Sequence, residues 1–246
     1  MSRVDYSEAA AAYRTSRRPA DDILERWGRV VRRRAGHRAC ALDLGAGPGL
    51  FLDPLRAWLS AEVVVAVEPS AAMRDEAAAG HPYVAAIAES LPCRTASFDA
   101  VWISAAVHQF DDRVVAAGEI RRVLRPGGVA LVRGFFADVP VSGAFGRFPG
   151  IERAARSFPS STDAVDDFAR AGLAHAGTDD VVEPWRVAVD DWRSRVAGVR
   201  SSDSLLRHLT DEEIDAGVHA NERAARNGYV DSEVTIRLLC FAAPAR

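Results

Sequence analysis

The stretch Cys40–Leu50, CALDLGAGPGL, places glycine at every second position directly after a short apolar run. Glycine weakens a strand and exposes its backbone, so Gly45, Gly47 and Gly49 indicate a loop that follows a strand. Glycine lets ligand atoms approach the main chain closely, and the helix N-terminus that follows favours an anionic group. We therefore expect a ligand to contact the backbone where this strand ends.

Short apolar runs alternate with helical segments from residue 39 onward. The runs that read as strands are 41–44, 62–68, 83–88, 98–104, 128–134, 181–189 and 234–242. Helical patterns at 49–59, 70–79 and 112–124 fill three of the four gaps between the first five of these. Apolar strands that alternate with helices favour a parallel sheet covered on both faces, which is an α/β fold.

Two further helical regions flank this alternation. Residues 7–34 read as helical with an interruption at Pro19, and 191–227 is a polar helical region before the last strand. The sequence LTDEEIDAG at 209–217 has the capping-box pattern that starts a helix. The chain has no internal repeat or low-complexity linker, so we expect residues 1–246 to form a single domain.

Composition excludes several classes of protein. The 246 residues carry a net charge of −3 with 48% hydrophobic residues, which indicates a soluble globular protein without a general attraction to nucleic acid or membranes. No apolar run approaches 18 residues and no signal peptide begins the chain, so we expect a cytoplasmic location. All 31 basic residues are arginine, which excludes Schiff-base and P-loop lysines. The scattered Cys40, Cys93 and Cys240 indicate reduced thiols, and we expect no metal site.

Two carboxylates accompany the glycine loop. Asp43 lies two residues before Gly45, and Glu68 ends the second strand, where an acid in such sheets binds ribose hydroxyls. A pyrophosphate fingerprint would place its third glycine at the position of Leu50, and Asp43 would repel a pyrophosphate. A carboxylate instead suits a cationic nucleoside without phosphate, and S-adenosylmethionine carries both an ammonium and a sulfonium.

The sequence resembles the class I S-adenosylmethionine-dependent methyltransferases, specifically the small-molecule group called type 11. The similar segments are LDLGAGPG, VVAVEPS with AAMRDEA, AAIAESLPCRTASFD and VLRPGGVALV, in matching order over about residues 37–135. The resemblance implies a doubly wound, mostly parallel seven-stranded sheet with the Rossmann-like methyltransferase fold. It further implies a helical N-terminal lid (1–36), a donor-binding core (37–135) and substrate-shaping helices and final strands (136–246).

The resemblance also implies which residues bind the donor: Tyr13, Arg18, Asp43, Gly45, Ala46, Gly47, Glu68, Pro69, Ala88, Glu89 and Ser104. Asp43 and the glycine loop would line the methionine end together with Ser104, and Glu68 would bind both ribose hydroxyls. Tyr13 and Arg18 belong to the first helix, which would close over the donor.

The adenine contacts depart from the family pattern at one position. Pro69 would pack near the adenine, and Ala88 and Glu89 would contact the ring and its amino group. The family often has aspartate where Ile87 stands, so the amino contact would pass to Glu89 or to backbone carbonyls.

His108 follows the fourth strand in SAAVHQF and is the candidate catalytic residue. Histidine titrates near pH 6.5, so it can remove a proton from the acceptor at neutral pH. Many class I methyltransferases act by proximity alone, however, and a structural hydrogen-bonding role for His108 is the open alternative.

The implied activity is transfer of a methyl group from S-adenosylmethionine to a small organic acceptor of specialised metabolism, with S-adenosylhomocysteine as product. No nucleic-acid or membrane partner is expected, and the segment after the fourth strand, SAAV, lacks the signature of nucleic-acid amine methylation. Arginines at 32–34 and at 121, 122 and 125 keep an RNA or protein methyltransferase open as an alternative. A second alternative is a non-catalytic nucleoside-binding regulator.

Overall fold

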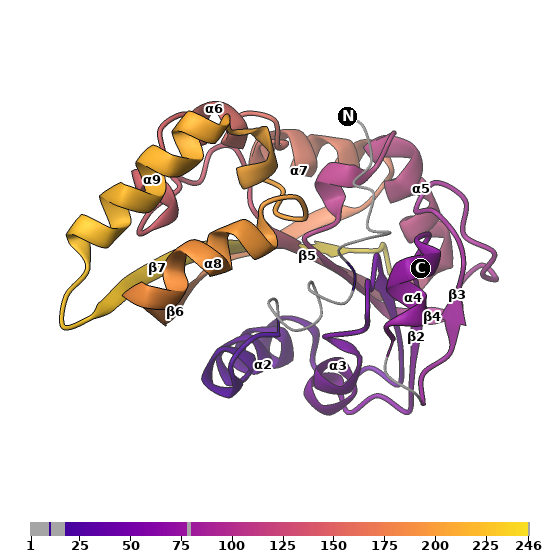
Figure 1. Ribbon diagram of the computed structural model, residues 1–246. Helices are drawn as coiled ribbons and strands as arrows, with labels where there is room; N and C mark the ends of the chain where they lie inside the picture. Colours follow the sequence, from indigo (N-terminus) through magenta and orange to yellow (C-terminus); the bar gives the residue numbers. More distant parts are fainter. Residues whose placement is uncertain (1–9, 11–17, 78–79, 246) are drawn as a thin grey trace.

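The computed structural model describes residues 10, 18–77 and 80–245, and within these residues it forms one seven-stranded sheet (Figure 1). The strand order is β3–β2–β1–β4–β5–β7–β6. The strands are β1 (Cys40–Leu44), β2 (Val63–Val67), β3 (Tyr83–Val84), β4 (Phe98–Ser104), β5 (Leu124–Gly134), β6 (Ala174–Ala188) and β7 (Tyr229–Ala242).

The sheet is mixed, with a parallel part and an antiparallel part. β1 pairs in parallel with β2 and β4, β2 with β3, and β4 with β5. β7 runs antiparallel to β5 and β6. The chain first builds outward from β1 to β3 and then returns to β4, so a topological switch point lies between β1 and β4. This is the doubly wound, mostly parallel seven-stranded sheet that the resemblance implied, and that prediction is confirmed.

Helices cover both faces of the sheet. α2 (Asp21–Ala35) and α3 (Leu52–Leu59) pack together on one face, and α5 (Arg113–Val123) and α7 (Ser161–Arg170) pack together on the other. The short helix α4 (Ala71–Asp75) follows β2 (Figure 1).

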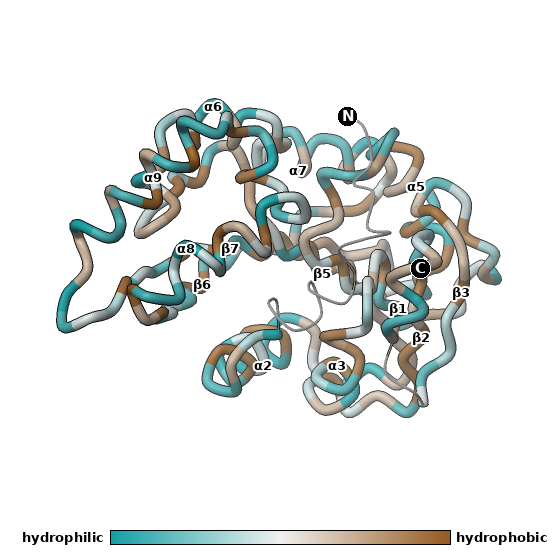
Figure 2. The backbone as a smooth tube through the Cα atoms, in the orientation of Figure 1, coloured by the Kyte–Doolittle hydropathy of each residue, from teal (hydrophilic) through white to brown (hydrophobic). Residues whose placement is uncertain are grey.

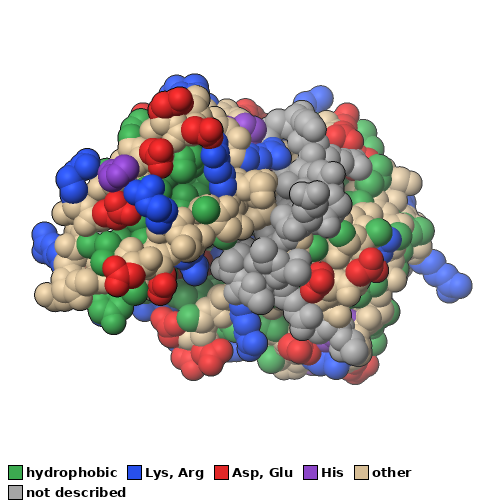
Figure 3. All heavy atoms as spheres, in the orientation of Figure 1, with side chains coloured by type: hydrophobic (Ala, Val, Ile, Leu, Met, Phe, Trp, Pro, Cys, Tyr) green, Lys and Arg blue, Asp and Glu red, His purple; other side chains and the backbone are tan. Residues whose placement is uncertain are grey.

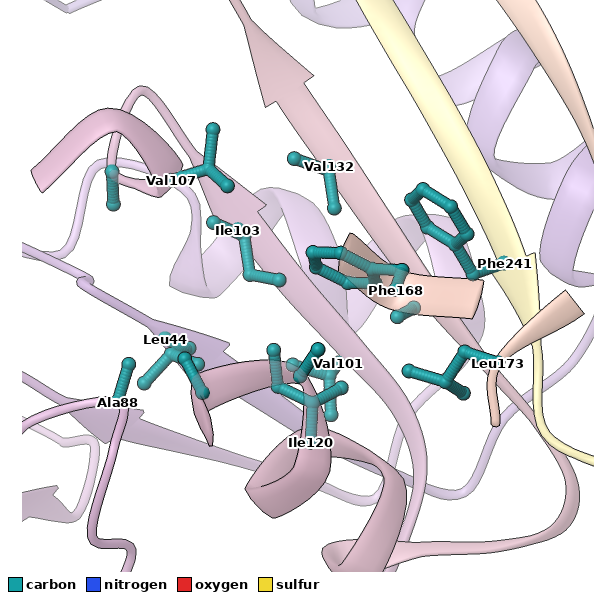
Figure 4. Packing of buried hydrophobic residues seen from close by; sticks show 14 of the residues in the cluster. Leu44, Ala88, Val101, Ile103, Val107, Ile120, Val132, Phe168, Leu173 and Phe241 are labelled. Carbon is teal, nitrogen blue, oxygen red and sulfur yellow. The ribbon is translucent and has the colours of Figure 1, made fainter. Parts of the chain in front are cut away.

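The helical layers on both faces explain why the central strands are mostly apolar. Along β1, Ala41 belongs to the buried cluster under α2 and α3, while Leu42 belongs to the cluster under α5 and α7. Since successive side chains point to opposite faces, a strand with a layer on each side needs an unbroken apolar run. Figure 4 shows the second cluster, where Phe168 of α7 stacks on Phe241 of β7 with ring centroids 4.3 Å apart.

The β6–β7 hairpin extends beyond the parallel strands and carries a helical lobe with its own buried cluster (Figure 1). The lobe contains α6 (Ile151–Ala155), α8 (Val189–Val199), α9 (Asp211–Ala224) and the 3₁₀ helices η2 (Phe145–Arg147) and η3 (Leu206–His208). Teal and brown alternate along α9 in Figure 2, as expected for a helix that buries one face. Its predicted capping box is present between Thr210 and Glu213.

Several element boundaries differ from the predictions. β3 ends at Val84 instead of residue 88, because this edge strand turns away and Ile87 forms an antiparallel bridge with Ser90. β6 begins at Ala174 instead of 181, and β7 begins at Tyr229 instead of 234, because antiparallel pairing recruits polar residues that strand propensity does not favour.

The N-terminal region divides near Pro19. Residues 21–35 form α2, which packs against α3 and buries Trp27 between these helices and the sheet. The predicted lid residue Tyr13 lies outside the described residues. Within the described part of the chain, no helix is both long enough and apolar enough to span a membrane.

Candidate active site

The glycine loop runs from the end of β1 to α3 at the switch point of the sheet. Gly45, Gly47 and Gly49 all have positive φ angles, of 75°, 55° and 84°, which side chains rarely tolerate. A Cβ on Gly49 would come within 2.5 Å of the Tyr83 hydroxyl, whereas a Cβ on Gly47 would meet nothing within 4 Å. The Cα face of Gly47 is therefore open to a ligand, while its carbonyl accepts from the Tyr83 hydroxyl at 3.2 Å.

Asp43 presents a buried carboxylate directly before this loop. The residue is 1% exposed, and its Oδ2 has no hydrogen-bond partner among the described residues. Burial, and secondarily the nearby Glu68, raises the pKa of the Asp43 carboxyl to about 8. A buried carboxyl without a partner is costly, so this position fits a ligand that brings a cationic donor such as an ammonium.

Glu68 follows β2 and is held by the backbone of the glycine loop. Its Oε2 accepts the Gly47 amide at 2.8 Å, and its Oε1 accepts the Ser70 amide at 2.9 Å. Burial raises its pKa, although these two amides act in the opposite direction. Each oxygen has a second lone pair, so the carboxylate can accept two hydroxyls of one ligand while it keeps both backbone bonds.

A cavity of about 460 Å³ connects these residues. Its walls include every predicted donor-binding residue that the structure describes: Arg18, Asp43, Gly45, Ala46, Gly47, Glu68, Pro69, Ala88, Glu89 and Ser104. We call the part of the cavity that these ten residues line the loop half. Because β3 ends early, Ala88 and Glu89 reach the wall of the cavity. Glu89 also accepts the Asp111 amide at 2.7 Å, which ties it to the segment after β4.

The remainder of the cavity, which we call the aromatic half, is enclosed by the β6–β7 hairpin and its lobe. Its walls include Phe135, Phe145, Trp185, Trp192, Arg133, Glu183, Arg195, Asp203, Val234 and Ile236. Other aromatic residues of these segments, Phe136, Phe148 and Phe158, are buried in the core. The sequence places aromatic residues in these segments, and only the structure separates wall from core.

His108 lies in the 3₁₀ helix η1 (Val107–Gln109) and is not among the described residues that line the cavity. Its Nε2 is 3.0 Å from the Ser204 hydroxyl, and its ring packs on Phe158 with centroids 4.6 Å apart. Burial lowers its pKa to about 4. These contacts favour the structural alternative over the role of general base.

Arg133 and Glu183 were not anticipated from the sequence. Arg133 is 9% exposed, donates to Glu183 at 2.5 Å and to the Ser104 hydroxyl at 3.0 Å, and places its guanidinium 4.9 Å from the Trp27 ring centroid. The sequence did hold a signal for Arg133, because it lies inside the apolar run GVALVRG and is therefore expected to be buried. A buried arginine needs a partner. The partner on β6 could not be identified from sequence.

Four of the arginines that suggested phosphate contacts, Arg33, Arg34, Arg122 and Arg125, are paired with carboxylates. Arg33 and Arg34 both bind Asp179, and Arg125 binds Asp99 at 2.7 Å. On the face shown in Figure 3, basic and acidic side chains are interspersed. Among the described residues, no group of three or more His, Cys, Asp or Glu side chains could hold a metal ion.

Comparison with known proteins agrees with this geometry. The family model for a methyltransferase domain matches residues 42–132. A malonyl-[acyl-carrier protein] O-methyltransferase of Enterobacter lignolyticus (strain SCF1) is 39% identical over 127 residues, which cover 50% of this chain and 47% of that protein. A demethylmenaquinone methyltransferase of Mycobacterium sp. (strain KMS) is 31% identical over 171 residues, covering 64% of this chain and 71% of that protein.

The chain therefore belongs to the class I S-adenosylmethionine-dependent methyltransferases. It spans about half the length of the first curated relatives that it matches. Among solved structures, the [4+2]-cyclase SpnF has a TM-score of 0.61 at 16% identity, with full coverage of both chains. That likeness concerns the fold alone.

Proposed function

We propose that this protein transfers the methyl group of S-adenosylmethionine to a small organic acceptor. The observation that carries the proposal is the buried Asp43, whose Oδ2 has no partner among the described residues and which lies beside Glu68 at the glycine loop. A cationic nucleoside supplies what both carboxylates need: an ammonium for Asp43 and a pair of hydroxyls for Glu68.

Each predicted residue then has a role in the loop half. Asp43 would accept from the donor's ammonium, and the Gly45–Gly47 backbone, including Ala46, would face its methionine end. Glu68 would bind the ribose, while Pro69, Ala88 and Glu89 would surround the adenine. The guanidinium of Arg18, which lines the same cavity, would bind the donor carboxylate.

The chemistry needs orientation more than proton transfer. S-adenosylmethionine supplies an electrophilic methyl group on a positively charged sulfur. Ser104 ends β4 at the junction of the two halves of the cavity, and its hydroxyl is already held by Arg133. The aromatic half would exclude water and hold the acceptor in line with the methyl group, because dispersal of the sulfonium charge is favoured in a dry, apolar site.

The shape of the cavity supports a small acceptor over RNA or protein. The aromatic walls come from segments that fold back over the sheet, and four of the arginines considered for phosphate contacts, Arg33, Arg34, Arg122 and Arg125, are engaged by carboxylates. An acceptor attached to a carrier protein, as the name of the Enterobacter relative describes, would still present a small reactive group.

Calorimetry with S-adenosylmethionine and S-adenosylhomocysteine tests the donor proposal, and release of S-adenosylhomocysteine across an acceptor panel tests the transfer. We expect both ligands to bind the wild type. They should bind equally well to Glu152→Gln, a control variant that changes an exposed acid on α6, away from the cavity. Absence of binding would refute the donor role. RNA affinity that falls steeply with salt would support the RNA alternative instead. Donor binding without release on any acceptor would favour the regulator.

A further inference from the structure

Glu183 is a carboxylate of the aromatic half that the donor does not account for. Its Oε1 accepts two hydrogen bonds, from Trp27 Nε1 at 2.6 Å and from Arg133 Nη2 at 2.5 Å. Its Oε2 has no hydrogen-bond partner among the described residues. Its side chain is 19% exposed, and the residue lines the cavity. One oxygen is therefore fixed, and the other is available to a ligand.

The position of Glu183 is set by a rigid chain of contacts. Arg133 links it to Ser104 at the end of β4, and the guanidinium lies 4.9 Å and 5.4 Å from the ring centroids of Trp27 and Phe51. These contacts come from α2, β4 and β5, from the residue that precedes α3, and from one strand of the hairpin. They hold the Glu183 carboxylate in the aromatic half and link it through Arg133 to Ser104, which lines the cavity as part of the loop half.

The surroundings of Glu183 are aromatic and aliphatic. Trp185 lies two residues along the same strand and therefore on the same face. It stacks on Trp192 with centroids 5.7 Å apart and meets Phe145 edge-on at 6.1 Å, while Val234 is the β7 residue paired with Glu183. These three aromatic side chains pack against one another and line the cavity, so a flat ring can pack on the surface that they present to it, because aromatic rings prefer stacked or edge-on partners.

The charges of the aromatic half indicate a neutral acceptor. Arg133 and Arg195 are balanced by Glu183 and Asp203, so the formal charges in this half cancel. Arg133 already donates to Glu183 and Ser104, and its buried Nε is not accessible to a ligand. A wholly apolar acceptor would cover the Glu183 oxygen without pairing it, which is costly, whereas an anionic acceptor would be repelled by it.

We infer that the acceptor is a neutral aromatic compound with a hydroxyl or amine hydrogen, and that Glu183 Oε2 accepts that hydrogen bond. Glu183 thereby determines acceptor specificity, with Trp185 and Phe145 as walls for the ring. This inference rests on the proposed methyltransferase function, since it places the acceptor beside a donor bound in the loop half.

The test compares wild type with Glu183→Gln in the presence of S-adenosylhomocysteine. Glutamine keeps an oxygen for Trp27 and Arg133 but presents an N–H₂ donor in place of Oε2. The probes are 2-naphthol, which can donate a hydrogen bond, and 2-methoxynaphthalene, which cannot. Affinities are measured by calorimetry and by quenching of tryptophan fluorescence. The matched control is Glu233→Gln, an exposed acid on β7 outside this cavity.

Wild type and Glu233→Gln should prefer 2-naphthol, and Glu183→Gln should bind 2-naphthol about 10- to 100-fold more weakly, the range for a lost hydrogen bond to a charged group. Binding of 2-methoxynaphthalene should not weaken. Equal 2-naphthol affinity in all three proteins, absence of 2-naphthol binding at millimolar concentration, or tighter binding of 2-naphthoate than of 2-naphthol would overturn the inference. These outcomes concern the naphthalene probes alone and would overturn the acceptor inference while S-adenosylhomocysteine still binds. If S-adenosylhomocysteine itself failed to bind the wild type, the proposed function would be refuted.

Discussion

Replacement of Asp43 by asparagine should make the ligand-free protein more resistant to unfolding at neutral pH than the wild type. Burial raises the pKa of Asp43 from 3.8 to about 8, so the folded state holds a proton that the unfolded state releases. The folded state binds more protons between these two values, and stability therefore falls as pH rises through this window. Asparagine has nearly the same shape and does not titrate.

The expected difference in the free energy of unfolding follows from the pH interval between the two pKa values of Asp43. Each pH unit between the two pKa values costs the wild type about 1.4 kcal/mol, so the advantage of Asp43→Asn should grow by about 4 kcal/mol from pH 4 to pH 7. Comparing the variant with the wild type at both pH values cancels the steric effect of the amide and the titration of groups that do not interact with Asp43. Urea unfolding followed by tryptophan fluorescence measures both free energies. Parallel pH dependence of the two proteins would show that Asp43 is already ionised near pH 4 and would refute the reasoning.

The same carboxyl should couple donor binding to proton release. An ammonium beside Asp43 favours the ionised form, so binding at pH 7 should release about 0.9 proton when the free pKa is about 8. Calorimetry in two buffers of different ionisation enthalpy measures this number. Asp43→Asn should release none through this site and should bind the donor more weakly. The variant would then be more stable and less functional, a trade-off common at active sites.

Three further results are expected. Glu68→Ala should weaken donor binding by about 1.5–3 kcal/mol in calorimetry, because a ligand would lose hydrogen bonds to a charged group, and unchanged affinity in a folded variant would refute the ribose role. Deletion of residues 1–20 should reduce donor affinity and turnover if the N-terminal segment closes over the donor; intact values would contradict the predicted lid. His108→Ala should lower the free energy of unfolding by about 1–3 kcal/mol through its lost contacts with Ser204 and Phe158 while donor affinity stays near wild type. A 10²- to 10⁴-fold loss of turnover at unchanged stability would instead identify His108 as the general base.

The loop half of the cavity was predictable because its parts are local in sequence. Gly45 and Gly47 follow a strand by a fixed spacing, and Asp43 precedes them on that strand. Glu68 lies at the end of the next strand, and parallel pairing brings the ends of neighbouring strands to one edge of the sheet. Local pattern and sheet topology together were enough to gather these residues.

The sequence by itself determined the layered α/β fold and the glycine loop with Asp43 and Glu68, since apolar periodicity, glycine loops and strand ends are properties of contiguous segments. The other residues of the loop half, Arg18, Pro69, Ala88, Glu89 and Ser104, followed only from the family resemblance. Tertiary structure alone decided the aromatic half, because Glu183 meets Arg133 and Trp27 across separations of 50 and 156 residues. It also decided that His108 packs on Phe158 instead of lining the cavity. Which polar side chain turns toward a cavity depends on the partner that its own element meets, and no local pattern encodes that partner.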